Sequence, residues 1–361
     1  MKEKEKQLFK ALCKFKEPLF ESALVEFATP TVLGHLFFNR MQGVAYDTLK
    51  QNGLLGEVNR EFRNSLEVAY EQNLQKNRSF CKCVTMLNQL FSSCKCNIAM
   101  LKGAYLCVHY PEGYRTSNDI DLLILPKDVT TVGDVLASAG FKQGSVKNSI
   151  FIPATRKEII ESKMMRGETV PYIKEVNLPF MKFLEVDINF SLDYKNGDDS
   201  ILENMLSNVY VRNEKGVAIS TFDDIDFFIH LCAHLYKEAT TLPWIEMKRD
   251  MTLYKYCDIY MLLSEMSDEK LQKVFDRAKK INMEKICAYA ILETMKLFDM
   301  NNIFAHHIAN TAISDDPEFC IRVFSPKDKK TLFYQTADTT ERFFAELRLN
   351  DLKEREFYEN A

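Results

Sequence analysis

Two aspartates, separated by one residue, are the most chemically specific feature of this chain. Asp119 and Asp121 alternate with Ile120 and Leu122 in a short apolar run. At the two-residue period of a β-strand, both carboxylates project from one face while the apolar side chains enter a core from the other. Parallel carboxylates repel each other and keep unpaired oxygens, so a fold that retains them often holds a hard divalent cation between them. A solvated surface strand explains the same spacing, and the pair alone does not decide between the two interpretations.

Residues suited to phosphate binding lie close to this pair in the sequence. Lys102 and Gly103 follow a short apolar run at 97–101, and Arg115 and Ser117 directly precede the aspartates. A nucleoside triphosphate needs cationic and hydroxyl donors beside an acidic metal site, because Mg²⁺ bridges the phosphates while other donors neutralise the remaining charge. The combination predicts a nucleotide site rather than a metal site alone.

The same segment resembles the signature of the polymerase-beta-like nucleotidyltransferase superfamily. The resemblance rests on Leu101-Lys102-Gly103, Tyr110-Pro111, Arg115 and Ser117-Asn118-Asp119-Ile120-Asp121-Leu122-Leu123. More narrowly, the chain is similar to a bacterial family known as uncharacterised nucleotidyltransferases. It is more distantly similar to the nucleotidyltransferase toxins of abortive-infection systems, which share the Lys-Gly turn. The order of helices and acidic strands follows the family over residues 21–263.

The superfamily has a third carboxylate on a later strand, and one segment of this chain can supply it. Residues 182–192 alternate so that Glu185, Asp187 and Asn189 share a face opposite an apolar one. The resemblance implies Asp187 as the third metal ligand, with Glu185 in reserve. The family commonly has a histidine where Asn189 stands, so histidine-dependent details do not carry over to this chain.

The resemblance implies transfer of a nucleoside monophosphate from a nucleoside triphosphate, such as ATP, to a hydroxyl acceptor, with release of pyrophosphate. Asp119, Asp121 and Asp187 would bind Mg²⁺ or Mn²⁺, and two cations about 3.5–4 Å apart stabilise the entering and leaving oxygens in such reactions. Asp187 would also help to deprotonate the attacking hydroxyl. The residues expected to contact the nucleotide are Lys102, Gly103, Arg115, Ser117, Lys255 and Asp258, the last two on a helix predicted at 251–263.

The composition is that of a globular protein without a strong overall charge. The chain has 361 residues, 46% of them hydrophobic, with a net charge of −4 and a pI near 6.0. This length is enough for two or three subdomains, and the lack of a positive field argues mildly against a long DNA or RNA partner.

The N-terminus lacks an apolar signal-like region and no run of about 18 apolar residues is present, which predicts a cytoplasmic protein without a membrane partner. Ten scattered cysteines predict reduced thiols.

The pattern of elements predicts an α+β fold with a small mixed sheet flanked by helices. We expect a helical N-terminal segment packed on the core at 1–95, a nucleotidyltransferase core at 96–220 and a helical C-terminal domain at 221–361. Strands are predicted at 97–101, 119–125 and 183–191, with 170–178 able to pair with the last of these. The mixed charges near the C-terminus, which include Arg342 and Arg348, predict a solvated helix face.

Three functions from different classes remain open at this stage. The first is a metal-dependent nucleotidyltransferase whose acceptor is a small molecule, a protein or an RNA end. The second is a toxin-like transferase that modifies a tRNA and needs a cognate antitoxin, which a basic groove beside the acids would favour. The third is a non-catalytic module that binds nucleotides. The sequence describes the nucleotide donor and contains no signature for the acceptor.

Overall fold

The computed structural model describes residues 1–15, 22–192 and 199–354, which form a mixed α and β structure. The expected α+β fold class, with a mixed sheet flanked by helices and helical N- and C-terminal regions, is confirmed. The chain divides into two compact units. One is continuous and contains residues 67–227, and the other contains both 1–66 and 228–361. This division differs from the boundaries expected after residues 95 and 220.

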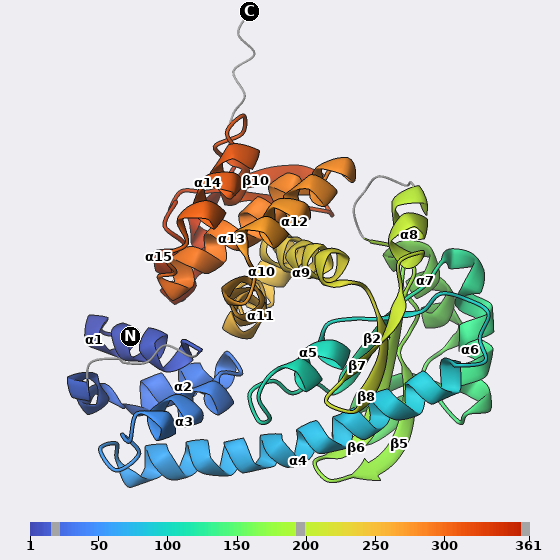
Figure 1. Cartoon of the computed structure of the whole chain (residues 1–361), viewed down its shortest axis with the longest axis horizontal. Helices are drawn as coiled ribbons and strands as arrows, with labels where there is room; N and C mark the ends of the chain where they lie inside the picture. Colours follow the sequence, from blue (N-terminus) through green and yellow to red (C-terminus); the bar gives the residue numbers. More distant parts are fainter. Residues whose placement is uncertain (16–21, 193–198, 355–361) are drawn as a thin grey trace, which may run out of the picture. The chain divides into compact units, whose positions relative to one another are not determined.

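A six-stranded mixed sheet forms the centre of the unit of residues 67–227, and Figure 1 shows it in green. Its strand order is β1-β2-β6-β5-β3-β4. The strands are β1 (Ala99–Met100), β2 (Asp119–Leu123), β3 (Lys142–Lys147), β4 (Ile150–Pro153), β5 (Tyr172–Leu178) and β6 (Met181–Asn189). β2 and β6 are parallel, whereas the other neighbours are antiparallel. The predicted strands and the pairing of 170–178 with the acidic strand are confirmed.

The remaining elements of this unit are helices and one separate hairpin. The helices are α5 (Gly103–His109), α6 (Val129–Ser138), α7 (Arg156–Arg166) and α8 (Asp199–Leu206), together with most of α4 (Arg60–Phe91) and the start of α9 (Asp224–Ala239). The hairpin joins β7 (Tyr210–Glu214) to β8 (Val217–Thr221). A short 3-10 helix, η2 (Pro126–Asp128), leads into α6.

One face of the central sheet is apolar and is covered by α6. Ile120 and Leu122 of β2 and Val186 of β6 have no exposed surface. α6 lies close to this face, since a Cβ placed on Gly133 would come within 2.5 Å of the hydroxyl of Tyr172, the strand neighbour of Val186. Burial of this alternating apolar set fixes the register, because a slip of one residue would turn the aspartates into the core.

The long helix α4 runs beside the same sheet and contacts one of its turns and the separate hairpin (Figure 1). The Ser79 hydroxyl donates to the Pro179 carbonyl at 2.8 Å, in the turn between β5 and β6. Further along, the Asn88 side chain accepts a hydrogen bond from the Ser220 backbone at 3.2 Å, on β8. Two positions of one helix therefore hold a turn of the central sheet and a strand of the hairpin.

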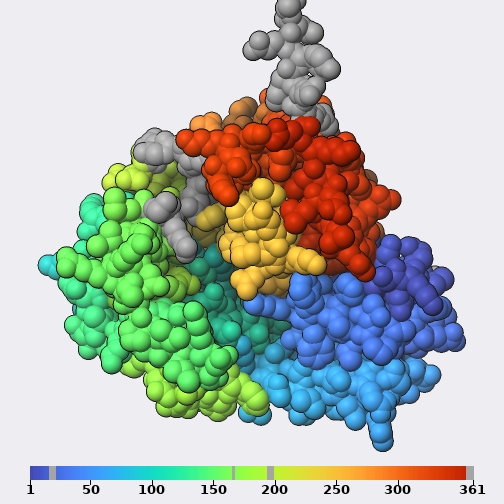
Figure 2. All heavy atoms as spheres, turned by 180° about the vertical axis from the view of Figure 1, so that it is seen from behind, coloured from blue at the N-terminus to red at the C-terminus, as the bar shows by residue number. Residues whose placement is uncertain are grey.

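The second unit is built mainly from helices contributed by both ends of the chain. They are α1 (Glu3–Cys13), α2 (Pro30–Phe38), α3 (Gln42–Gln51), α10 (Leu242–Glu246), α11 (Leu253–Ser264), α12 (Asp268–Lys280), α13 (Glu284–Phe298), α14 (Ile303–Ala312) and α15 (Thr339–Phe344), with η1 (Ser22–Phe27), η3 (Phe319–Ile321) and η4 (Arg348–Asp351) as 3-10 turns. Phe9 of α1 stacks on Phe343 of α15 with ring centroids 5.9 Å apart. Figure 2 accordingly shows the blue N-terminal and red C-terminal surfaces of this unit in contact.

The C-terminal region departs from the expected run of helices in two ways. A three-stranded sheet in the order β11-β10-β9 is formed by β9 (Arg322–Ser325), β10 (Lys330–Tyr334) and β11 (Leu352–Lys353). The expected solvated helix face is wrong for Arg342, which is buried against Glu293, and for Arg348, which donates two hydrogen bonds of 2.8 Å to Asp250, whereas Glu341 of the same set is exposed. Glu293 and Asp250 are both buried, so these arginines are required as counter-charges inside the fold.

No helix in the described ranges is both long and apolar enough to cross a membrane. All ten cysteines are free thiols, and six of them are buried.

Candidate functional site

The predicted acidic residues come together on neighbouring strands of the central sheet. In the parallel pairing of β2 with β6, Asp119 lies beside Glu185 and Asp121 lies beside Asp187. Side chains at paired positions of neighbouring strands share a face, and strands are about 4.8 Å apart. Four carboxyl groups therefore occupy the face opposite the apolar layer, all of them partly buried.

Burial and mutual repulsion raise the pKa of three of these acids. The pKa of Asp187 is raised to about 8, chiefly by burial and then by the negative charges of Asp121 and Asp119. Burial also raises the pKa of Asp121, and it outweighs the attraction of the Lys102 ammonium. The pKa of Glu185 is raised by burial and by Asp119. The raised values show that burial, with added repulsion among the acids, disfavours the ionised form of these three side chains.

Asp119 differs from its neighbours because it is stabilised as a carboxylate. Burial would raise its pKa, but a hydrogen bond from Ser117 and the charges of Lys102 and Arg115 outweigh burial and lower it. The Ser117 hydroxyl donates to Asp119 Oδ1 at 2.5 Å. Environments that push neighbouring carboxyl groups in opposite directions allow one to stay ionised while another exchanges a proton.

The predicted Lys-Gly turn forms a strained bend beside the acids. Lys102 has a φ of +46° and a ψ of −114°, a backbone conformation that residues other than glycine rarely adopt. Its ammonium nitrogen lies 2.9 Å from Asp121 Oδ1. Strain of this kind persists where the surrounding structure holds it, and it is common at ligand-binding sites.

Gly103 is required by close packing at the start of α5. A Cβ at this position would lie 2.8 Å from Ser117 Cβ and 2.9 Å from its hydroxyl oxygen. The glycine therefore lets Ser117 approach the helix N-terminus and still reach Asp119. This role differs from the close approach of a phosphate expected from the sequence, which stays a prediction.

The loop that carries Arg115 is fixed by an asparagine that the sequence analysis did not single out. Asn77 of α4 is buried, and its amide donates to the carbonyl oxygens of Cys107 at 3.1 Å and Arg115 at 2.7 Å. Its side-chain oxygen accepts from the Gly113 backbone at 3.2 Å. Arg115 also donates from its guanidinium to the Thr116 carbonyl at 2.6 Å. Asn77 lies three and seven residues before the buried Phe80 and Val84, and a polar residue at helical spacing from that apolar stripe was the signal that could have identified it.

The donor chemistry of the acidic face fits a hard divalent cation, although the side chains are directed elsewhere. Carboxylate oxygens are the ligands that Mg²⁺ and Mn²⁺ prefer. Within residues 1–15, 22–192 and 199–354, no three His, Cys, Asp or Glu side chains are grouped closely enough to hold a metal ion. Asp121 instead bonds to Lys102 and Asp119 to Ser117. A cation shared by these acids would have to replace those partners.

Two predicted nucleotide-binding residues, Lys255 and Asp258, belong to the other unit, on α11. Both are buried, and the Lys255 ammonium forms an ion pair with Glu238 and donates to the Arg249 carbonyl at 3.0 Å. Their expected role in binding the nucleotide stays a prediction. Asn189, where the superfamily often has histidine, shares the face of Asp187, and its amide contacts the Leu122 carbonyl at 3.4 Å.

A mixed sheet with acids on neighbouring parallel strands is the arrangement expected for the nucleotidyltransferase class, and comparison with known proteins supports this class. Residues 30–299 match the family described as uncharacterised nucleotidyltransferase, and the chain belongs to that family. No curated protein is significantly similar to it. It is similar to the crystal structure of an antigenic nucleotidyltransferase-like protein from Paracoccidioides brasiliensis, with 14% identity over 58% of this chain and 92% of that chain and a TM-score of 0.35.

Proposed function

We propose that this chain transfers a nucleoside monophosphate from a nucleoside triphosphate to a hydroxyl acceptor and releases pyrophosphate. The observation that carries the proposal is the parallel register of β2 and β6, which sets Asp121 beside Asp187 and Asp119 beside Glu185. The raised pKa of Asp187 supports it, because a surface strand with solvated acids would not accumulate such charge. Membership of the nucleotidyltransferase family supports the reaction class.

Each acid has a distinct part in the proposed reaction. Asp119, Asp121 and Asp187 would hold Mg²⁺ or Mn²⁺, which when bound neutralises phosphate charge and stabilises the displacement at the α-phosphorus. The acceptor oxygen forms a bond to the α-phosphorus while the bond to the pyrophosphate oxygen breaks. Asp187, as a carboxylate, takes the proton of the acceptor hydroxyl.

The residues around the acids would bind the triphosphate. Lys102 already contacts a carboxylate oxygen at 2.9 Å, and its ammonium can exchange that oxygen for a phosphate oxygen. Arg115 adds a second positive charge, which acts on both Asp119 and Asp121. Ser117 would donate its hydroxyl either to Asp119 or to a phosphate.

The proposal is tested by incubating the full chain with each α-labelled nucleoside triphosphate, Mg²⁺ or Mn²⁺ and a cell extract. We expect label to appear in protein, RNA or a small molecule, and the fraction that contains it identifies the acceptor class. The variant Asp119→Asn/Asp121→Asn should lose at least about 100-fold of this transfer, because the charges that hold the cation are removed. Glu175→Gln, an exposed acid on β5, is the matched control and should retain activity. Equal transfer by the double variant would contradict the proposal.

A further inference from the structure

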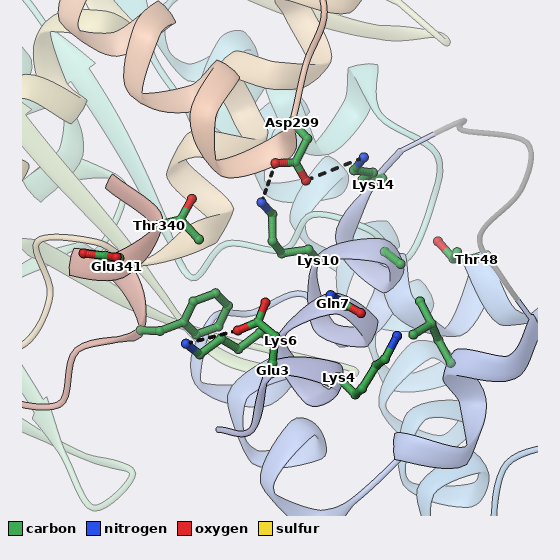
Figure 3. A pocket seen from close by; sticks show the side chains of 13 residues that line it. Glu3, Lys4, Lys6, Gln7, Lys10, Lys14, Thr48, Asp299, Thr340 and Glu341 are labelled. Atoms are coloured by element: carbon green, nitrogen blue, oxygen red, sulfur yellow. Dashed lines mark hydrogen bonds and ion pairs between the residues drawn. The ribbon is translucent and has the colours of Figure 1, made fainter. Parts of the chain in front are cut away.

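A lysine-lined cavity lies in the unit of residues 1–66 and 228–361, separate from the acids of the central sheet. It has a volume of about 760 Å³ and is lined by residues of α1, η1, α3, the end of α13 and α15. Pockets for small molecules typically have volumes of about 300–1,000 Å³. Figure 3 shows four lysines of the N-terminal segment along one wall. They are Lys4, Lys6, Lys10 and Lys14.

Three of these lysines form a stripe along one face of their helix. Lys6, Lys10 and Lys14 are spaced by four residues, so they project from one face of α1 and its C-cap. Like charges at this spacing destabilise a helix. Lys4 and Lys6 also stand near the N-terminus of α1, where the helix dipole disfavours a cation. Lys10 and Lys14 lie in the last turn and at the C-cap, where the dipole favours a cation, so repulsion within the stripe is partly offset at this end.

The stripe already binds one anionic group. Asp299 contacts Lys10 at 2.6 Å and Lys14 at 4.0 Å, and Figure 3 shows both lysines directed at its carboxylate. Asp299 follows the C-terminus of α13 with a φ of +49°, a left-handed conformation, and the helix dipole disfavours a carboxylate there. More than half of its side chain is exposed, so it can move away into water. Two partly buried lysines thus hold a carboxylate that its own helix end disfavours.

Neutral donors and an aromatic ring also line the cavity, together with two acids, Glu3 and Glu341, the first of which lies 3.7 Å from the Lys6 ammonium. Gln7 of α1 and Thr48 of α3 supply an amide and a hydroxyl. Phe344 of α15 supplies a ring, and the Lys6 ammonium lies 5.4 Å from its centroid. Such a mixture suits a ligand that has both charged oxygens and a less polar body.

We propose that this cavity binds a phosphorylated small molecule, one of whose phosphate groups takes the place of the Asp299 carboxylate between Lys10 and Lys14. A phosphate carries more charge and more acceptor oxygens than a carboxylate, so it can bond to both ammonium groups at once. The half-enclosed shape favours a single small molecule over a nucleic-acid strand. This site is independent of the transferase reaction proposed for the central sheet.

The experiment measures binding of three probes to the full chain by calorimetry, in EDTA so that metal-dependent binding at the acids is suppressed. The probes are pyrophosphate, ATP and ribose 5-phosphate, which share phosphate chemistry and differ in the attached group. Lys10→Gln/Lys14→Gln should weaken binding by about tenfold or more, because two charge-assisted hydrogen bonds are lost. The control Lys279→Gln/Lys280→Gln removes the same charge from exposed positions of α12 in the same unit and should leave affinity within about twofold.

Asp299→Asn provides an independent test of the displacement. Asparagine tolerates the left-handed conformation, so the fold should be retained. Removal of the competing charge should strengthen binding by about threefold to tenfold. Binding of ATP that is the tightest of the three and is weakened by Lys10→Gln/Lys14→Gln would assign a nucleotide to the cavity, and the same result for pyrophosphate or ribose 5-phosphate would assign a ligand without a base. The proposal is overturned by no binding of any probe, by equal losses for the two lysine pairs, or by weaker binding to Asp299→Asn.

Discussion

At the scale of single residues, the central sheet gathers more negative charge than its surroundings neutralise. Asp187 lies beside Asp121 and near Asp119. Among the described residues, Lys102 makes an ammonium contact to Asp121. An uncompensated buried charge costs stability, so the chain retains this cluster at the expense of its own folding free energy. That cost is measurable because it depends on pH and on which side chain is removed.

We expect Asp187→Asn to stabilise the metal-free protein at alkaline pH. The pKa of Asp187 is about 8 in the folded state and 3.8 in the reference state, so the folded chain retains a proton that the unfolded chain releases. The stability contributed by this retained proton is fully present below about pH 4 and is lost as the pH rises through about 8. Asparagine does not titrate. The variant should therefore match the wild type near pH 4 and exceed it by about 1–3 kcal/mol near pH 8.5.

Urea unfolding in EDTA at several pH values checks this expectation. Glu175→Gln removes an exposed carboxylate from the same sheet and should leave the pH dependence of the free energy of unfolding unchanged. A lower stability of Asp187→Asn near pH 8.5 would contradict the charge excess inferred for this face.

The backbone at Lys102 offers a second prediction. Glycine accepts the φ of +46° without strain, whereas other residues pay about 1–3 kcal/mol there. Lys102→Gly and Lys102→Met both remove the ammonium that contacts Asp121. The difference between their stabilities therefore reports the cost of the backbone conformation at this position. We expect Lys102→Gly to be the more stable of the two by about 1 kcal/mol in thermal or urea unfolding, while both lose nucleotide transfer. Equal stability of the two variants would show that the bend is not strained.

At the scale of elements, α4 links the sheet to the loop that carries Arg115. Asn77 makes two hydrogen bonds to that loop and a third to the Cys107 carbonyl of α5, and Asn73 makes one to the Gly113 carbonyl at 3.0 Å. Gly113 itself has a φ of +87°, and a Cβ there would come within 2.6 Å of Tyr70 on the same helix. The helix therefore determines the path of a loop that is distant in the sequence.

Asn77→Ala should loosen this loop more than Asn73→Ala does. The first change leaves three buried backbone groups without their partner, and each such group costs about 1–3 kcal/mol when unsatisfied, although water entry reduces the total. We expect a loss of stability of about 2–4 kcal/mol for Asn77→Ala and about 1 kcal/mol for Asn73→Ala. Hydrogen exchange should show the difference at the Gly113 amide. Equal protection of that amide in both variants would contradict the role given to Asn77.

The sequence could predict the elements whose side chains alternate at a regular period, and these include the strands that carry the acids. β2 and β6 were identified because one face is apolar and the other acidic. The partners of Asn77 and Arg342 were not predictable, since they lie 30 to 49 residues away and leave no local pattern. The C-terminal sheet was also missed, because its strands have only two to five residues.

At the scale of the whole molecule, the two ends of the chain build one unit and the residues between them build the other. Both boundaries fall inside helices, α4 and α9, without a Gly-, Pro- or Ser-rich linker. A division based on composition cannot find such boundaries, which explains why the expected ones differ. The unit made from the chain ends also depends on contacts between distant segments, such as the buried pair of Glu293 and Arg342.

Arg342→Met tests whether the two units respond separately to a change in one of them. Glu293 is fully buried and accepts hydrogen bonds from Arg342 and from the Thr339 hydroxyl at 2.7 Å. Loss of the guanidinium leaves a buried carboxylate short of its counter-charge and should destabilise this unit by about 3–5 kcal/mol. Lys330→Met breaks an exposed ion pair with Glu354 in the same unit and should cost at most about 1 kcal/mol.

Calorimetry distinguishes the two units. We expect Arg342→Met to lower the unfolding transition of its own unit. The transition of the unit of residues 67–227, which contains the acids of the central sheet, should still be raised by Mg²⁺ and nucleotide as in the wild type. Equal shifts of both transitions would mean that the chain unfolds as one cooperative body.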